Sequence, residues 1–179
     1  MLRRKIKIGL IGFGNIGQKR YKSLLDISSF LIDVTYIVDI KKPKNIKKKI
    51  KIFSNWKDVK KIHVDLIIVS TPTKESKIIV NNLAGKFNIL VEKPLSNKLN
   101  EIKKLVKISN INNKLLKVGY NLRFDDGLIK SKELLDKKLI GNVYYIKIFY
   151  ANGAAKTNSN KIGSLLDMGT HSINLLIWL

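Results

Sequence analysis

The feature that most constrains the fold of this chain is a short glycine-rich run between an apolar strand-like stretch and a helix-like stretch. The run occupies residues 12–17, after the apolar stretch 6–11 and before the helical pattern 16–27. In a strand-turn-helix unit of this kind, the first glycine makes a tight turn, the second lets the backbone approach a pyrophosphate, and the third lets helix and strand pack closely. A phosphate then lies at the positive end of the helix dipole. This strand-turn-helix context predicts a dinucleotide-binding site. The alternative is an ordinary turn between a strand and a helix. The predicted cofactor-binding residues of the run are Gly12, Phe13, Gly14, Asn15, Ile16 and Gly17.

A second element of such a site is an acidic residue at the end of the next strand. The apolar run 34–38 ends in Asp39, which follows Gly17 by 22 positions. A carboxylate there accepts hydrogen bonds from the adenine ribose hydroxyls and repels a 2′-phosphate, so NAD is favoured over NADP. The alternative is a turn aspartate, and the lysines within 41–44 keep NADP possible.

The order of the remaining elements predicts an α/β fold, with a Rossmann-type, doubly wound parallel sheet. Apolar strand-like runs alternate with helical patterns, which places helices on both faces of a parallel sheet. The strands are almost continuous in apolar residues, as strands buried on both faces must be. The expected strands are 6–11, 34–38, 50–53, 66–69, 89–91 and 115–118, and the expected helices are 16–27, 75–84 and 97–109, with one helical turn at 56–59.

The pattern changes after Tyr120, where no further strand-helix unit follows. The expected elements are a helix at 128–138, a turn at 141–142, one longer strand at 143–150 and a helix from 164 to 179. We therefore expect a dinucleotide-binding domain over residues 1–119. Residues 120–179 are expected to begin an incomplete α+β second domain.

Three short segments directly follow predicted strands. They are Thr71-Pro72, Glu92-Lys93-Pro94 and Asn121-Leu122-Arg123-Phe124. In an open α/β sheet the carboxyl ends of the strands form the edge where ligands bind, so these segments and the glycine run should face one crevice. For Lys93 the alternative is a solvated turn residue, because lysine is abundant in this chain.

Asp167 and His171 form another candidate pair. They are four positions apart, so in a helix beginning at Ser164 they lie on the same face. An imidazole beside a carboxylate can accept a proton near neutral pH. The alternatives are that Asp167 belongs to a capping box with Ser164 and that His171 is a partly buried histidine with a backbone partner.

The net charge of +22 would ordinarily indicate a nucleic-acid or anionic-membrane partner. However, the chain holds 31 Lys, 27 Ile and 17 Asn against 4 Arg, and the first three share AT-rich codons. Codon bias explains all three at once, whereas selection for phosphate binding explains only the lysine. We therefore expect non-specific, salt-dependent binding of polyanions and no specific nucleic-acid partner.

Composition also limits which kinds of site and which classes of protein are expected. The chain contains no cysteine and two histidines, so we expect neither a disulfide nor a metal site. No apolar run reaches the roughly 18 residues of a membrane-spanning helix, and the amino terminus lacks a secretory signal pattern. We expect a cytoplasmic protein without a membrane partner.

Taken together, the motifs resemble those of the Gfo/Idh/MocA oxidoreductase family. GLIGFGNIG, Asp39, STPT, VEKP, YNLRF and LLDMGTHSINLL occur in that family's order and approximate spacing, over the whole chain. The resemblance implies an NAD(P)-dependent enzyme that oxidises a secondary alcohol of a sugar, cyclitol or nucleotide sugar. It also implies a homo-oligomer for the full-length form. The rival classes are a non-catalytic NAD(P)-binding sensor or remnant, and a nucleic-acid-binding protein.

The resemblance also implies roles for individual residues. Lys93 would orient the reacting hydroxyl and the nicotinamide, His171 would be the general base, and Asp167 would position or polarise the substrate and the histidine. Arg123 and Asn121 would belong to the nicotinamide and substrate pocket. Thr71, Pro72 and Glu92 would contact the cofactor.

Two features depart from the family pattern. Family members often carry a histidine four residues after the proline of the TP motif, where this chain has Ser76, so we assign Ser76 no catalytic role. Members also continue through a large, mostly antiparallel sheet, of which this chain has its first strand. We therefore expect the substrate wall and the usual oligomer interface to be missing.

Overall fold

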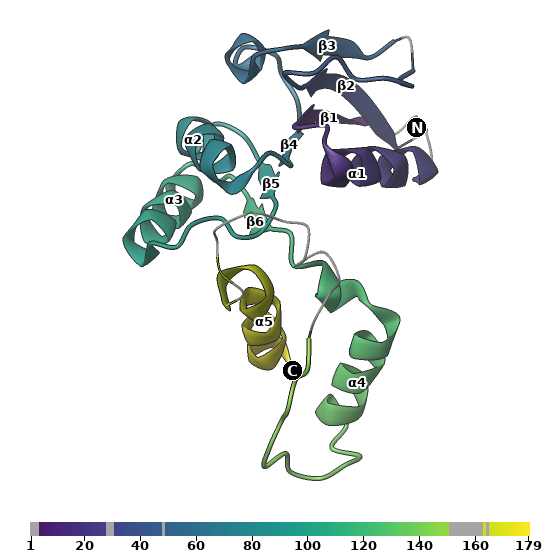
Figure 1. Ribbon diagram of the computed structural model, residues 1–179, viewed down its shortest axis with the longest axis vertical. Coiled ribbons are helices and arrows are strands. Elements are labelled where there is room, and N and C mark those ends of the chain that lie inside the picture. Colours follow the sequence, from purple (N-terminus) through teal and green to yellow (C-terminus); the bar gives the residue numbers. More distant parts are fainter. Residues whose placement is uncertain (1–3, 28–30, 48, 151–162, 164) are drawn as a thin grey trace. The chain divides into compact units, whose positions relative to one another are not determined.

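The chain forms two compact units, Met1–Val118 and Gly119–Leu179. The computed structural model describes residues 4–27, 31–47, 49–150, 163 and 165–179, and Figure 1 shows the elements of each unit. No helix among these residues is long and apolar enough to cross a membrane.

The first unit is built on a six-stranded parallel sheet in the order β3-β2-β1-β4-β5-β6. The strands are β1 (Ile6–Ile11), β2 (Ile32–Val38), β3 (Lys51–Phe53), β4 (Leu66–Val69), β5 (Ile89–Val91) and β6 (Leu116–Val118). The chain runs outward from β1 to β3 and then returns to start again at β4, beside β1. The direction of winding reverses between these two strands, which makes a ligand-binding crevice at their carboxyl ends.

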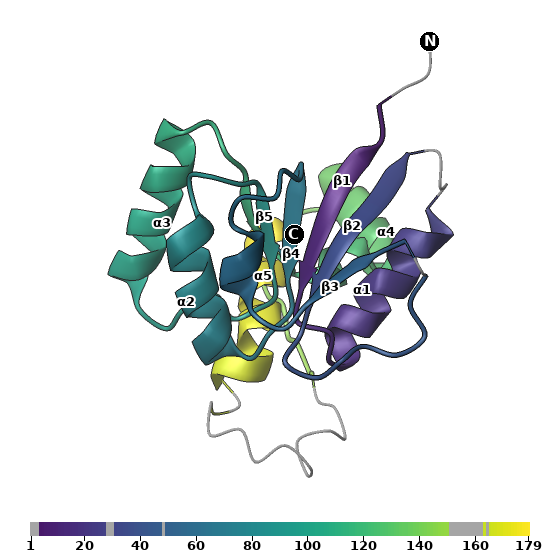
Figure 2. The same ribbon diagram turned by 90° about the horizontal axis from the view of Figure 1, so that it is seen from above.

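Helices cover both faces of this sheet. They are α1 (Asn15–Asp26), α2 (Thr73–Leu83) and α3 (Leu99–Ile111), with a 3₁₀ turn, η1, at Trp56–Val59. Figure 2 shows α1 on one side of the sheet and α2 and α3 on the other. Right-handed crossovers require this arrangement, because the two halves of the sheet are wound in opposite directions. The predicted doubly wound α/β fold is confirmed.

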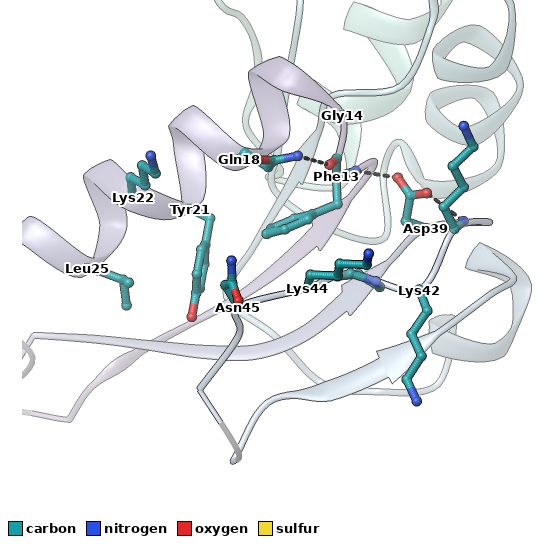
Figure 3. A pocket seen from close by; sticks show the side chains of 12 residues that line it. Phe13, Gly14, Gln18, Tyr21, Lys22, Leu25, Asp39, Lys42, Lys44 and Asn45 are labelled. Carbon is teal, nitrogen blue, oxygen red and sulfur yellow. Dashed lines mark hydrogen bonds between the residues drawn. The ribbon is translucent and has the colours of Figure 1, made fainter.

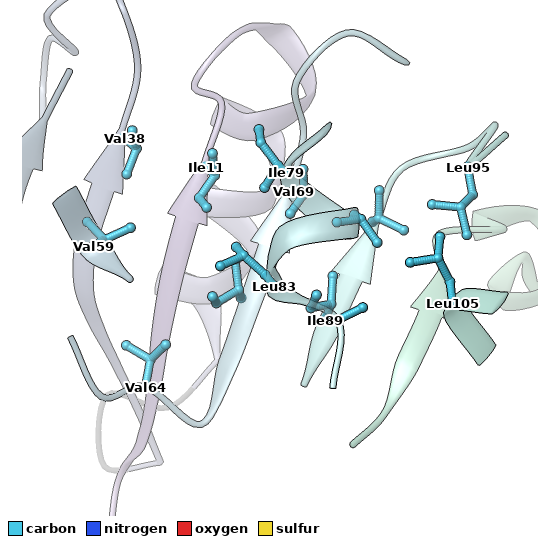
Figure 4. Packing of buried hydrophobic residues seen from close by; sticks show 14 of the residues in the cluster. Ile11, Val38, Val59, Val64, Val69, Ile79, Leu83, Ile89, Leu95 and Leu105 are labelled. Atoms are coloured by element: carbon cyan, nitrogen blue, oxygen red, sulfur yellow. The ribbon is translucent and has the colours of Figure 1, made fainter. Parts of the chain in front are cut away.

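The core consists of two clusters, one on each face. Alternate side chains of a strand point to opposite faces, so Leu10 packs on the α1 side and Ile11 on the α2 side. The α1 cluster includes Tyr21 from the helix, and the other cluster includes Leu83 and Leu105 from α2 and α3. Figure 4 shows the second cluster. Burial on both faces explains why these strands are apolar throughout.

Tyr36 in β2 requires a glycine opposite it. Its side chain is fully buried, and a Cβ on Gly9 of β1 would lie 2.1 Å from the Tyr36 ring. Burial raises the pKa of Tyr36, and its hydroxyl has no hydrogen-bond partner among the described residues. Gly9 thus makes space for a large ring whose polar end is unsatisfied.

The second unit is helical over its described residues. Its elements are a 3₁₀ turn, η2 (Asn121–Phe124), then α4 (Asp126–Asp136), a π-helical segment, η4 (Leu165–Gly169), and α5 (Thr170–Trp178). The helix predicted from residue 128 begins at Asp126, because the Asp125 carboxylate caps it by accepting a hydrogen bond from the Leu128 N–H.

One prediction for this unit is wrong, and another is confirmed with a difference in helix type. Residues 143–150 form no strand, because a strand needs a neighbour for its backbone hydrogen bonds and none of the described segments supplies one. The segment predicted as a helix from 164 to 179 is helical over 165–178, but it is not a single α-helix. Residues 165–169 are π-helical, and the α-helix begins at Thr170. Ser164, its predicted first residue, lies outside the described residues.

Candidate cofactor site

The three glycines of the 12–17 run, here called the glycine loop, meet different surroundings. Gly12 has φ of 93°, and a Cβ there would lie 2.7 Å from the Ser70 backbone. A Cβ on Gly17 would lie 2.1 Å from the carbonyl oxygen of Gly12. The protein's own packing therefore requires both glycines. A Cβ on Gly14, in contrast, would meet no atom within 4 Å. The space in front of Gly14 is open to a ligand.

The glycine loop leads directly into the amino terminus of α1. Gly14 is the N-cap residue in an extended conformation, no side chain caps the helix, and its first turn contains no acidic residue. The first N–H groups of a helix have no intrahelical partners and carry its positive dipole end. Such an end, next to the open space at Gly14, suits a phosphate group.

Asp39 anchors the glycine loop to the end of β2. Its two carboxylate oxygens accept hydrogen bonds from the backbone N–H of Phe13, at 2.6 Å, and of Lys41, at 2.8 Å. Figure 3 shows both bonds. Sequence reasoning predicted a ribose contact for Asp39 and missed this anchoring role. Each carboxylate oxygen has a second lone pair, so the side chain can still accept a hydrogen bond from a hydroxyl group.

Two clefts meet at Asp39 and Gly14. The first, the apolar cleft, has a volume of about 450 Å³ at the carboxyl ends of β1, β2 and β4. Its apolar lining residues include Val38, Ile40, Trp56, Pro72, Ile78 and Ile79. An apolar cleft beside a hydrogen-bonding carboxylate suits a flat heterocyclic base attached to a sugar.

The second, the lysine cleft, has a volume of about 710 Å³ and lies between α1 and the loop after β2. Phe13 and Tyr21 contribute aromatic rings, which meet edge to face with centroids 5.5 Å apart (Figure 3). The lysines of its lining are Lys22, Lys41, Lys42 and Lys44. Asp39 lines both clefts, so a ligand held by its carboxylate would also lie near these lysines.

Ser76 holds the turn formed by Thr71 and Pro72 after β4. The Ser76 side chain is buried, its hydroxyl donates to the Thr71 carbonyl oxygen at 2.8 Å, and the two hydroxyls lie 2.9 Å apart. Pro72 is the N-cap residue of α2. Ser76 therefore fixes the strand-end turn through hydrogen bonds.

The turn after β5 carries an ion pair that sequence reasoning missed. Arg20 of α1 donates to Glu92 Oε1 through Nε at 2.8 Å, and its Nη2 lies 2.7 Å from the same oxygen. Arg20 follows Gly17 by three positions, so it shares the face of α1 that Gly17 turns toward the sheet. The spacing of Arg20 from Gly17 was the feature of the sequence that could have indicated a contact between Arg20 and the sheet. Lys93, the next residue after Glu92, is half-buried and precedes Pro94 through a cis peptide bond.

In the second unit, Arg123 of η2 is held by α5. Its Nε donates to the Asn174 side-chain oxygen at 2.6 Å, its Nη2 donates to the Asn174 carbonyl at 3.3 Å, and its guanidinium lies 5.8 Å from the Trp178 ring centroid. Asn121 lies in the same 3₁₀ turn. These contacts join η2 to α5 within the unit.

His171 is buried among aromatic rings at the start of α5. Its ring meets those of Tyr120 and Tyr150 edge to face, with centroid distances of 6.2 and 5.6 Å. Burial raises the pKa of Tyr120, against the opposing effect of the Arg123 charge. Asp167 lies in the π-helical segment, where its N–H donates to the Gly163 carbonyl. Lys93 belongs to the first unit and His171 to the second, so the roles that the family resemblance implies for them stay predictions.

The chain is similar to curated proteins that include an inositol dehydrogenase. It is 25% identical over 184 residues to the inositol 2-dehydrogenase/D-chiro-inositol 3-dehydrogenase of Shouchella clausii, covering 97% of this chain and 53% of the relative. It is also 25% identical to the rhizopine catabolism protein MocA of Rhizobium meliloti, covering 98% of this chain and 57% of that protein. The chain thus spans about half the length of the curated relatives it matches.

The fold agrees with a solved structure that contains a cofactor. The scyllo-inositol dehydrogenase of Lactobacillus casei, with bound NAD(H) and scyllo-inositol, superposes with a TM-score of 0.78 at 21% identity. The match covers 98% of this chain and 56% of that enzyme. The family described as "Oxidoreductase family, NAD-binding Rossmann fold" (GFO_IDH_MocA) matches residues 6–120, which include the glycine loop, Asp39 and the turns after β4 and β5. This chain belongs to that family.

Proposed function

We propose that this chain binds NAD(H) and contributes to hydride transfer between nicotinamide and a secondary alcohol of a sugar, cyclitol or nucleotide sugar. The observation that carries the proposal is the open space at Gly14, beside an uncapped helix terminus and the Asp39 carboxylate. Gly12 and Gly17 are explained by internal packing, whereas the missing side chain at Gly14 is explained by a ligand that approaches the backbone.

We expect particular residues to hold each part of the cofactor. Gly14 and the amino terminus of α1 would hold the pyrophosphate, and Asp39 would accept hydrogen bonds from the adenine ribose. The apolar cleft would take the adenine. Thr71, Pro72, Glu92 and Lys93, which follow β4 and β5, would contact the nicotinamide half. NAD is preferred because Asp39 repels a 2′-phosphate, while the lysine cleft leaves NADP possible.

Family resemblance assigns the remaining steps to the second domain. Bound nicotinamide supplies the hydride acceptor. Loss of the hydride to that acceptor and of the hydroxyl proton turns the alcohol into a ketone, and His171 would take the proton. Lys93 orients the reacting hydroxyl, and Asp167 positions His171 and the substrate. Asn121 and Arg123 belong to the substrate pocket, and the domain that begins near residue 120 would supply the rest of it.

The test is a dehydrogenase assay with the whole chain. NAD+ reduction is followed by absorbance over a panel of inositols, sugars and nucleotide sugars. Turnover that disappears in Gly14→Val and in His171→Asn, with both variants folded, supports the proposal. Saturable NADH binding without turnover on any of these alcohols would support the cofactor-binding part of the proposal and contradict hydride transfer by this chain alone. A folded chain that binds no nicotinamide nucleotide would contradict both.

A further inference from the structure

The Arg20–Glu92 ion pair joins two elements that border the proposed cofactor site. Arg20 lies in α1, the helix that follows the glycine loop, and Glu92 is the first residue after β5. Their side chains are 30% and 19% exposed, so the pair is partly shielded from water. Charges in such a position act on their surroundings more strongly than charges in bulk solvent.

By the sheet order, this pair would lie near the nicotinamide end of the proposed cofactor. A 3-2-1-4-5-6 sheet has two mononucleotide halves, with the pyrophosphate at the winding reversal between β1 and β4. Asp39, at the end of β2, assigns the adenosine to the half formed by β1 to β3. The nicotinamide therefore belongs to the half formed by β4 to β6, where Glu92 ends β5.

The two redox states of the cofactor differ at this place by one charge. The nicotinamide ring carries a positive charge in NAD+ and none in NADH. A bare carboxylate beside the ring would stabilise NAD+ alone, and a bare guanidinium would destabilise NAD+ alone. The paired charges largely cancel.

We propose that Arg20 is a specificity-determining residue, which neutralises Glu92 and thereby sets the relative affinity of the site for NAD+ and NADH. This inference rests on the proposed function, because it requires a nicotinamide at the end of β5. Under this proposal, Arg20 acts on the affinity for the cofactor and does not only link α1 to the turn after β5. A purely structural link would affect both redox states in the same direction.

The experiment measures the dissociation constants of NAD+ and NADH for the whole chain and its variants by titration. Arg20→Gln should raise the ratio Kd(NADH)/Kd(NAD+) by about fivefold, and Glu92→Gln should lower it by a similar factor. The double variant should return within about twofold of the wild type, because neither charge remains. Arg20→Lys keeps the charge and should keep the ratio, even where binding itself weakens.

A matched control exists on the opposite face of the sheet. Lys77 of α2 and Glu101 of α3 form an ion pair of the same 2.7 Å length, with side chains 36% and 28% exposed. Lys77→Gln and Glu101→Gln should leave the ratio unchanged. Thermal melting checks that each variant is folded.

Opposite shifts in the two single variants support the inference. An unchanged ratio, or shifts in the same direction, in protein that binds both nucleotides would overturn it and leave the proposed function standing. A folded wild-type chain that binds neither nucleotide would overturn both.

Discussion

The two units of this chain bury their apolar side chains to very different extents. Among the described residues, all buried apolar side chains but Leu175 belong to the first unit. In the second unit Tyr144, Tyr145 and Phe149 are 92%, 77% and 82% exposed. In the first unit, each strand has a parallel neighbour and each face of the sheet has helices. Apolar content alone does not make a core, because each apolar face also needs a partner surface.

The largest effect on stability is expected from adding a side chain at Gly17, which packs closely against the backbone of Gly12. Gly17→Ala places a Cβ against the Gly12 carbonyl, so we expect a loss of about 3 kcal/mol in the free energy of unfolding. Gly14→Ala, which meets no neighbouring atom, should change it by less than about 0.5 kcal/mol. Urea denaturation followed by circular dichroism measures both. Equal losses would show that the glycine loop is not packed as described.

The second unit is expected to drive self-association. Its exposed rings form apolar surface of the kind that associates in water, so the double variant Tyr144→Ser/Phe149→Ser should lower the average mass seen by light scattering. Ile40→Ser is the matched control, because Ile40 is 88% exposed but lies in the first unit. A monodisperse wild-type monomer would contradict this prediction.

A smaller effect on stability is expected at the amino-terminal ends of the central strands β1 and β4. Asp65 there accepts hydrogen bonds from the Lys7 N–H and from Arg4. The Lys7 N–H chiefly, with Arg4, lowers the pKa of Asp65 from its ordinary 3.8, against an opposing effect of burial. A lowered pKa contributes stability that is present above pH 3.8 and is lost as the pH falls through the folded-state value. Asp65→Asn should therefore lower Tm at pH 7, with a difference that shrinks below pH 3.8. A Tm difference that persists in acid would show that Asp65→Asn acts through the local structure and not through the charge of the carboxylate.

The smallest effect is expected at Tyr36. Its buried hydroxyl has no hydrogen-bond partner in the described part of the chain, so Tyr36→Phe removes an unsatisfied polar group and keeps the ring against Gly9. Thermal melting should show a change between zero and a gain of about 1 kcal/mol. A loss above that size would reveal a partner for the hydroxyl.

The first unit could be predicted from the sequence because its signals are local. Continuous apolar strands, helical periodicity and the glycine loop each act over a few residues, and the sheet and its helices lie where these patterns indicated. The Arg20–Glu92 pair and the contact of Asp39 with the Phe13 N–H join residues 72 and 26 positions apart. Such contacts depend on the packed geometry, which local patterns do not contain.

The second unit was predicted less well for the same reason. The alternation over 143–150 indicates a strand, but strand formation depends on a neighbour that a local pattern does not specify. The π-helical turn at 165–169 likewise has no periodicity of its own that sets it apart from the start of an α-helix. The predicted roles of Asp167 and His171 rest on family resemblance.

The most direct test of the account is a titration of the whole chain with NADH, followed by nucleotide fluorescence, for the wild type and Gly14→Val. Gly127→Ala, which changes the helical glycine of α4, is the control. We predict saturable binding below millimolar concentrations for the wild type and for Gly127→Ala. Gly14→Val should lose binding, because the added side chain enters the space of the ligand, and its melting temperature should change little, because a Cβ there meets no atom within 4 Å. Absence of saturable binding to folded wild-type protein, or equal binding by Gly14→Val, would contradict the assignment of the glycine loop as the cofactor site.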